Sequence, residues 1–181
     1  MATILDIHEG KRRLTARKGF EPWSRRFGFA FDQSTSVRLL DSSIVRFIIR
    51  GGEDSAMALY ELIMGITGLG PGLRFHYLES ENKMGVTDIT LFLLDLLRFE
   101  AMYRLGWLDD YSFLRIPLID LIQGFKDQFS AARHKSPALC STHPRYSEYL
   151  SEFEGDRNSF VRKLIPEAIQ IFCKTDDTGK S

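Results

Sequence analysis

Apolar residues recur at helical spacing over much of the chain, and the longest such segment is GVTDITLFLLDLLRFEAMYRLGW. Projected at about 100° per residue, its apolar side chains cover nearly the whole circumference of a helix. A helix with that pattern is normally surrounded by other helices. We therefore predict a central buried helix over about 87–105, with Thr87 as its N-cap and an end near Gly106.

Further helical segments precede and follow this one. They are expected between Asp41 and Gly51 with Asp41 or Ser42 as the cap, from Asp54 to the glycines at 65–70, at about 115–132, from Pro144 over a short stretch, and at about 158–174. In the last segment Pro166 lies off the apolar stripe, so it should bend the helix or start a new one. The predicted fold class is mainly α, an irregular single-domain helical bundle.

A small β element is expected beside the bundle. Phe27, Phe29 and Phe31 alternate with Gly28 and Ala30, and a period of two is typical of a strand. The segment LRFHYLE, at about 73–78, is the second strand candidate. We predict a β element at about 27–31 and 73–78, in which the two strands could pair.

The charged residues are unevenly distributed, although the 24 basic and 24 acidic residues of the chain cancel. The first 26 residues contain Lys11, Arg12, Arg13, Arg17, Lys18, Arg25 and Arg26 against Asp6, Glu9 and Glu21, which gives +4 there and −4 in the remainder. No overall field therefore draws the protein toward polyanions. We predict a basic N-terminal arm or ribbon at 1–26, one helical domain at 27–174 and a disordered polar tail at 175–181.

The composition, 44% hydrophobic and 27% charged over 181 residues, is that of a globular protein and argues against disorder. Cys140 and Cys173 are too few for a disulfide scaffold, which favours a reducing compartment. Asp6 and the charges after His8 interrupt any secretion signal, and no apolar run approaches the roughly 20 residues that span a bilayer. We expect a cytoplasmic protein that does not associate with membranes.

The stretch RRFGFAFD resembles the RNP1 signature of RNA-recognition-motif domains, in which bases stack on spaced aromatic side chains of a strand. The matching residues are Arg25, Phe27, Gly28 and Phe29. Arg26, Ala30 and Asp32 stand where that signature has glycine, valine and an aromatic residue. The mainly helical remainder also departs from the element order of such domains, so the resemblance covers these eight residues only.

A looser hypothesis of nucleic-acid binding needs only arginines, lysines and exposed rings in one segment. Its contact residues, within 11–31, would be Arg17, Lys18, Trp23, Arg25, Arg26, Phe27 and Phe29. The alternative is that these aromatic side chains pack on the open end of the bundle.

Carboxylates inside apolar helical runs are the main candidates for a ligand pocket. Asp95 precedes Arg98 by three residues and Glu100 precedes Arg104 by four, so each pair should share a helix face. Glu61 and Asp120 have no basic residue within one turn and should face solvent or a pocket. The predicted pocket residues are Glu61, His76, Asp120 and His143.

The chain has no Glu-x-x-His or HExxH motif, so we predict no metal and no cofactor. His134, Cys140 and His143 lie close together in a loop segment, where a thiol beside a base or a pair of zinc ligands is one interpretation and a polar linker the other. Only Cys173 remains as a further sulfur ligand for zinc.

No catalytic constellation emerges from these motifs. We expect a non-catalytic helical protein that acts through a protein partner or through self-association as a homo-oligomer. The first alternative is a ligand-binding protein or enzyme with the pocket just described, and the second is nucleic-acid binding through 11–31.

Overall fold

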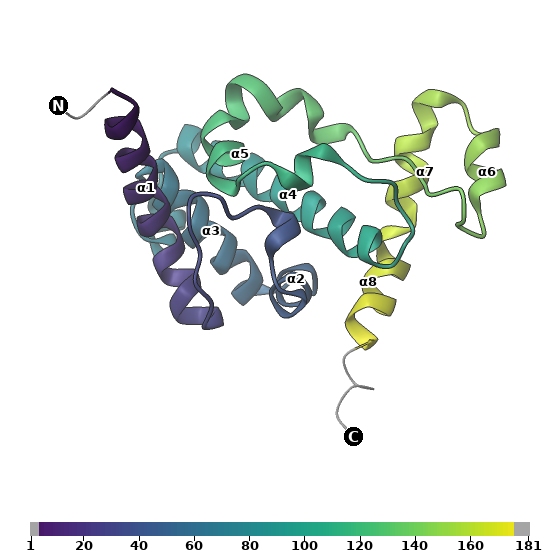
Figure 1. Cartoon of the computed structure of the whole chain (residues 1–181), viewed down its shortest axis with the longest axis horizontal. Coiled ribbons are helices and arrows are strands. Elements are labelled where there is room, and N and C mark those ends of the chain that lie inside the picture. Colours follow the sequence, from purple (N-terminus) through teal and green to yellow (C-terminus); the bar gives the residue numbers. More distant parts are fainter. Residues whose placement is uncertain (1–3, 176–181) are drawn as a thin grey trace.

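The chain folds into helices joined by turns and longer loops in the computed structural model, which describes residues 4–175 (Figure 1). The α-helices are α1 (Ile4–Phe27), α2 (Ser42–Ile49), α3 (Glu53–Thr67), α4 (Ser80–Arg104), α5 (Leu118–Gly124), α6 (Tyr146–Ser151), α7 (Arg157–Lys163) and α8 (Ile165–Lys174). Short 3₁₀ segments are η1 (Val37–Leu39), η2 (Gly72–Tyr77), η3 (Ser112–Arg115), η5 (Ser130–His134) and η6 (Glu154–Asp156), and η4 (Phe125–Phe129) is a π-helical turn. The prediction of a mainly helical bundle is confirmed.

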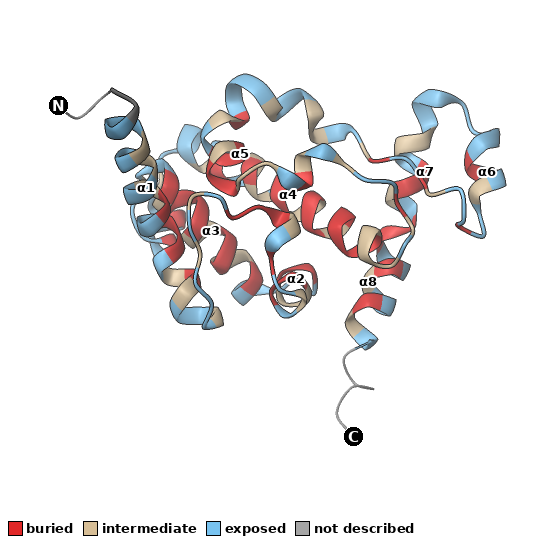
Figure 2. Ribbon diagram, in the orientation of Figure 1, coloured by how far each residue is buried: buried red, intermediate tan, exposed pale blue. Residues whose placement is uncertain are grey.

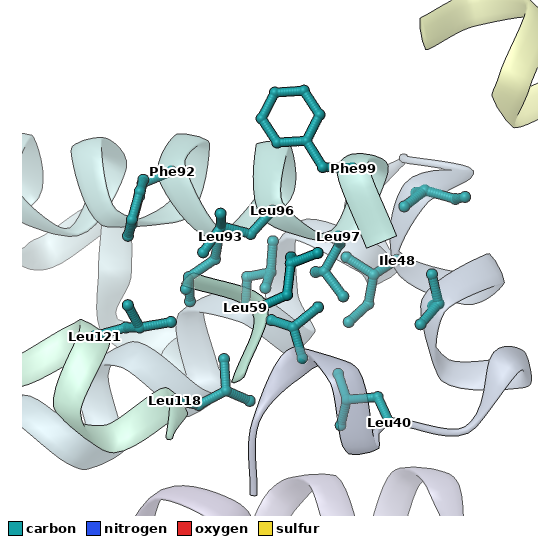
Figure 3. Close-up of a cluster of buried hydrophobic side chains, with 14 of the residues drawn as sticks. Leu40, Ile48, Leu59, Phe92, Leu93, Leu96, Leu97, Phe99, Leu118 and Leu121 are labelled. Atoms are coloured by element: carbon teal, nitrogen blue, oxygen red, sulfur yellow. The ribbon is translucent and has the colours of Figure 1, made fainter. Parts of the chain in front are cut away.

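Helix α4 is the central helix, and it packs against α2, α3 and α8. Figure 3 shows Leu93, Leu96 and Leu97 of α4 beside Leu59 of α3 and Ile48 of α2. From Phe92 to Leu105 no residue of the helix is exposed, whereas exposed residues recur between Ser80 and Leu91 (Figure 2). The predicted enclosure therefore applies to the C-terminal half of α4 alone.

The helix also starts earlier than the predicted cap at Thr87. The Thr87 hydroxyl donates a hydrogen bond to the backbone oxygen of Lys83 at 2.8 Å, one turn back. A threonine that bonds in this way lies inside a helix and does not cap it. Helix α4 begins at Ser80 instead. Its first two turns are formed by residues that the predicted helix of about 87–105 did not include.

Helix α1 occupies the segment predicted as a basic arm or ribbon. Ala16, Phe20 and Trp23 are each 1% exposed, and their spacing places them on one face of the helix against α3. The indole Nε1 of Trp23 donates to the backbone oxygen of Ala58 at 2.7 Å. Gly65 permits the close approach, since a Cβ there would lie 2.9 Å from the Cα of Gly19.

The predicted β element is wrong for both segments, and residues 4–175 contain isolated β-bridges but no strand. Helix α1 continues through Phe27, after which Gly28 adopts φ 73° and breaks the expected alternation. The second segment is the 3₁₀ helix η2, whose Phe75 ring stacks on Tyr60 of α3 with 4.0 Å between centroids. Phe27, Phe31 and Phe75 thus pack on the helices, whereas Phe29, Leu73 and Tyr77 of the same segments are exposed.

The C-terminal segment divides at Pro166. Helix α7 ends at Lys163 and α8 begins at Ile165, so the proline starts a new helix. Two arginines of the α2 segment bind the last turn of α8, where Arg46 Nε donates to the oxygen of Phe172 at 3.1 Å and Arg50 Nη2 to that of Cys173 at 3.3 Å. The predicted tail lies outside the described residues apart from Thr175, which follows α8.

Among residues 4–175, none of the helices combines the length and the apolar character that crossing a bilayer requires.

A fully buried carboxylate fixes the start of α2 on α4. Glu100 has no exposed surface, and its two oxygens accept hydrogen bonds from Arg104 Nε at 2.7 Å and Arg38 Nε at 2.8 Å. Arg104 also donates to the backbone oxygen of Leu40 at 2.7 Å and to the Ser42 hydroxyl at 2.9 Å. An unpaired buried charge would destabilise the fold by several kcal/mol. Arg38 and Arg104 offset this cost by binding both oxygens of the Glu100 carboxylate.

We predict that Glu100→Ala lowers the free energy of unfolding by about 3–5 kcal/mol, because it leaves two partly buried arginines without their carboxylate. Urea denaturation followed by circular dichroism measures this loss. The control is Glu148→Ala, which removes an exposed partner of Arg145 and should change stability little. Equal losses in the two variants would contradict the assigned role of Glu100.

The cap of α2 agrees with its prediction from sequence. Asp41 Oδ1 accepts hydrogen bonds from the backbone nitrogen of Ser43 at 2.8 Å and from its hydroxyl at 2.6 Å. These two bonds hold the pKa of Asp41 below its ordinary value. The ionised form of Asp41 therefore binds the helix terminus more strongly than the protonated form does.

We predict that Asp41→Ala destabilises the protein by about 1 kcal/mol at neutral pH. The pKa of Asp41 is lower in the folded protein than in the unfolded chain, where it is about 3.9. The stabilisation by the ionised carboxylate is therefore fully present above about pH 3.9 and is lost as the pH falls through the folded pKa of Asp41. The stability difference between the parent and the variant should therefore narrow below about pH 4. Thermal unfolding across this pH range tests it, and a constant difference would contradict the pKa shift. Asp109→Ala, on an exposed loop, is the control.

Candidate functional site

The structure does not bring Glu61 and Asp120 together in one pocket. Glu61 accepts a hydrogen bond from Arg26 Nη2 at 3.0 Å, and Asp120 accepts two from Arg12 at 2.7 and 3.1 Å. Arg12 and Arg26 both belong to α1, and at about 1.5 Å per residue they lie about 21 Å apart along its axis. The two carboxylates therefore attach different turns of α1 to α3 and α5.

The two predicted pocket histidines have unlike surroundings. His76 is exposed on η2, where its ring meets Phe75 edge-on. His143 is buried against the ring of Trp107, and its Nδ1 accepts a hydrogen bond from the backbone nitrogen of Arg145 at 3.1 Å. Burial lowers the pKa of His143, so its neutral form is favoured there.

The loop with Cys140 and His143 contains a free thiol. Cys140 Sγ lies 3.2 Å from the hydroxyl of Thr142, and Cys173 is also free. In the part of the chain that the structure describes, no group of three or more His, Cys, Asp or Glu side chains is arranged to hold a metal ion.

The rings of the proposed nucleic-acid segment are largely committed to packing. Trp23 is buried, and Phe27 meets the rings of Trp23 and Phe47 at 5.5 and 5.3 Å between centroids. Arg26 is held by Glu61. The proposed contact residues that are exposed and form no ion pair with any other residue of 4–175 are Arg17, Lys18, Arg25 and Phe29. Base stacking on Trp23 or Phe27 would require these rings to leave the core.

The predicted local ion pairs of α4 are confirmed. Arg98 donates to Asp95 at 3.3 Å, and Arg104 donates to Glu100 at 2.7 Å. Each carboxylate also binds an arginine from a distant segment, Arg162 for Asp95 at 2.6 Å and Arg38 for Glu100. Sequence spacing reveals the partner on the same helix but not the one supplied by tertiary packing.

An open groove of about 790 Å³ lies where α3 ends, α4 begins and α5 continues into η4. Its apolar lining consists of Ile66, Leu69, Met84, Val86, Ile89, Ile122 and Phe125. Most of these side chains are buried, but Met84 is 63% exposed. The polar lining consists of Thr67, Glu81, Asn82, Asp88, Gln123, Lys126 and Ser130. The groove thus combines an apolar floor with a polar rim, as binding sites commonly do.

One wall of the groove has an irregular backbone. After α5 the chain makes the π-helical turn η4 and then the 3₁₀ turn η5. Such π-helical turns are rare and occur frequently at functional sites. Arg133 of η5 donates to Asp88 of α4 at 2.7 Å, so an ion pair ties this wall to the opposite one.

Gly85 leaves the groove open on the α4 side. A Cβ added at Gly85 would meet nothing within 4 Å, and the residue lies in the groove lining. No local sequence pattern predicts this groove, because its residues come from three separate segments. No capping side chain marks the start of α4, because its N-cap is Glu79 and no side-chain hydrogen bond caps the helix there.

The ionisable side chains of the lining are Glu81, Asp88 and Lys126, and Asp88 is already held by Arg133. No serine or cysteine in the lining is paired with a general base. The lining thus offers a ligand mainly apolar contacts, together with the charges of Glu81 and Lys126. Comparison of the chain with protein-family models, with curated proteins and with solved structures finds no match.

We predict that Gly85→Ala stabilises the protein by about 0.5–1 kcal/mol, because alanine favours the helix and its methyl group has free space. Gly65→Ala should destabilise it, since its methyl group would lie 2.9 Å from the Cα of Gly19. Urea unfolding midpoints measure both. Destabilisation by Gly85→Ala would show that the groove is closed at this position.

Proposed function

We propose that this chain is a non-catalytic module that binds an amphipathic helix of a partner protein in the groove between α3, α4 and α5. The observation that carries the proposal is the open groove with its apolar floor and polar rim. Helix-in-groove recognition uses apolar anchors at i, i+3 or i+4, and i+7 on one face of the bound helix. Those anchors would lie on Ile66, Ile89 and Phe125.

The open form of the groove favours a helix over a small molecule. Sites for small ligands commonly enclose about 70–90% of the ligand surface. A helix buries only its apolar face in a groove and leaves its polar face in water. Met84 suits such an occupant, because methionine is flexible and adapts to irregular apolar surfaces.

The rim charges would set the direction of the bound helix. Neither Glu81 nor Lys126 forms an ion pair within residues 4–175, and both line the groove. A partner helix with a basic residue near Glu81 and an acidic one near Lys126 would match this pair. We further propose a cytoplasmic location, which the two free cysteines support.

We predict that Gly85→Trp abolishes partner binding, because Gly85 lines the groove and a Cβ there meets nothing within 4 Å, so the indole would occupy the space that the partner needs. The full chain, Gly85→Ala, Gly85→Trp and the control Gln170→Trp, on the exposed face of α8, are compared as baits in cell extract. Crosslinking mass spectrometry then locates the contact. A specific partner should crosslink at the groove of the parent, survive Gly85→Ala and Gln170→Trp, and be lost with Gly85→Trp. Circular dichroism checks that each variant is folded.

Three outcomes would contradict the proposal. A partner retained by Gly85→Trp binds elsewhere. A low-mass ligand seen by native mass spectrometry, and lost with Gly85→Trp, would support the alternative of a ligand-binding protein or enzyme. Oligonucleotide binding that resists Gly85→Trp but is lost when Arg17, Lys18 and Arg25 become alanine would support the nucleic-acid alternative.

A further inference from the structure

Helix α1 has an outward face that combines exposed apolar and basic side chains. This α1 face consists of Ile7, Lys11, Leu14, Lys18 and Arg25, which recur at helical spacing. It lies opposite the buried stripe of α1 and contains one acid, Glu21, on its edge. Ile7 is 63% exposed and Leu14 is 53% exposed. None of its three cations forms an ion pair within residues 4–175.

The turn between α6 and α7 has the complementary composition. This acidic turn consists of Leu150, Glu152, Phe153, Glu154 and Asp156. Phe153 is 85% exposed and Leu150 is 48% exposed. Its three carboxylates are also exposed and lack ion-pair partners in the described part of the chain. Two large apolar side chains are therefore presented to solvent beside three carboxylates, and the one cation bound at this turn is Arg157, which donates to the backbone oxygen of Leu150 at 3.3 Å in the described part of the chain.

The two surfaces lie at opposite ends of the long axis of the molecule (Figure 1), so they cannot meet within one copy. We propose that they meet between copies, with the α1 face of one molecule against the acidic turn of the next. The contact would bury Ile7 and Leu14 against Leu150 and Phe153 while opposite charges face each other.

The charges determine which surfaces can pair. Pairing of two α1 faces would oppose lysines and an arginine, and pairing of two acidic turns would oppose carboxylates. Both symmetric arrangements are therefore disfavoured, and the head-to-tail contact remains. Such a contact leaves one unused surface at each end, so it generates a ring if the rotation closes and an open chain if it does not. Because both surfaces are small, the association should be weak and concentration-dependent.

This proposal is independent of the groove, whose lining includes no residue of either surface. Self-association should therefore persist in Gly85→Trp, the variant that fills the groove. The proposed functions of the two regions can then be separated by experiment.

The test is sedimentation velocity of the full chain over a range of protein concentrations, at about 50 mM and 500 mM salt. The weight-average mass should rise with protein concentration at low salt and fall toward the monomer at high salt, because salt screens exposed charges. Two charge-reversal variants dissect the contact. One carries Lys11→Glu, Lys18→Glu and Arg25→Glu, and the other carries Glu152→Lys, Glu154→Lys and Asp156→Lys.

Each reversal variant alone should remain monomeric, because its two ends then carry charge of the same sign. An equimolar mixture of the two variants, and a chain with all six reversals, should associate again, because opposite ends become complementary. A monomeric parent at every concentration would overturn the proposal. So would reversal variants that associate as the parent does, or a mixture that stays monomeric. Circular dichroism establishes that the variants are folded.

Discussion

The pairing of Glu100 is the constraint on which the arrangement of the bundle depends. A carboxylate without exposed surface must be satisfied by hydrogen-bonded cations, and the two that serve it come from α4 itself and from η1. Arg104 extends the network to Leu40 and Ser42, so the whole connection from η1 into α2 is fixed on the C-terminal half of α4. That half of α4 is consequently enclosed, and the bundle is organised around it.

The groove in which we propose that a partner helix binds lies at the N-terminal half of α4, where the helix is no longer enclosed. The N-terminal half of α4 is partly exposed, and the groove is the space between it, the end of α3 and the irregular backbone after α5. Gly85 contributes no side chain to fill that space, and the Arg133 to Asp88 ion pair holds its walls together. The same helix thus forms part of the core at one end and one wall of the groove at the other.

The sequence predicted features that depend on local spacing. The fold class, the cap at Asp41 and the ion pairs within α4 all follow from residues one turn apart. The strand at 27–31 was wrong because Phe27 still belongs to α1 and packs on Trp23, and Phe31 stacks on Phe20 from beyond the helix end, whereas Phe29 is exposed. Glu61 and Asp120 seemed unpaired because their arginines lie far away in the sequence on α1. The groove depends on a π-helical turn and on three separated segments, which no local pattern encodes.

Hydrogen exchange along α4 tests most directly the claim that one half of this helix is core and the other half is a binding wall. The amides of 94–102 should exchange only through global unfolding, whereas those of 84–88 should exchange at least about tenfold faster through local opening. Equal protection in both halves would contradict the account, and so would faster exchange around Glu100 than around Gly85.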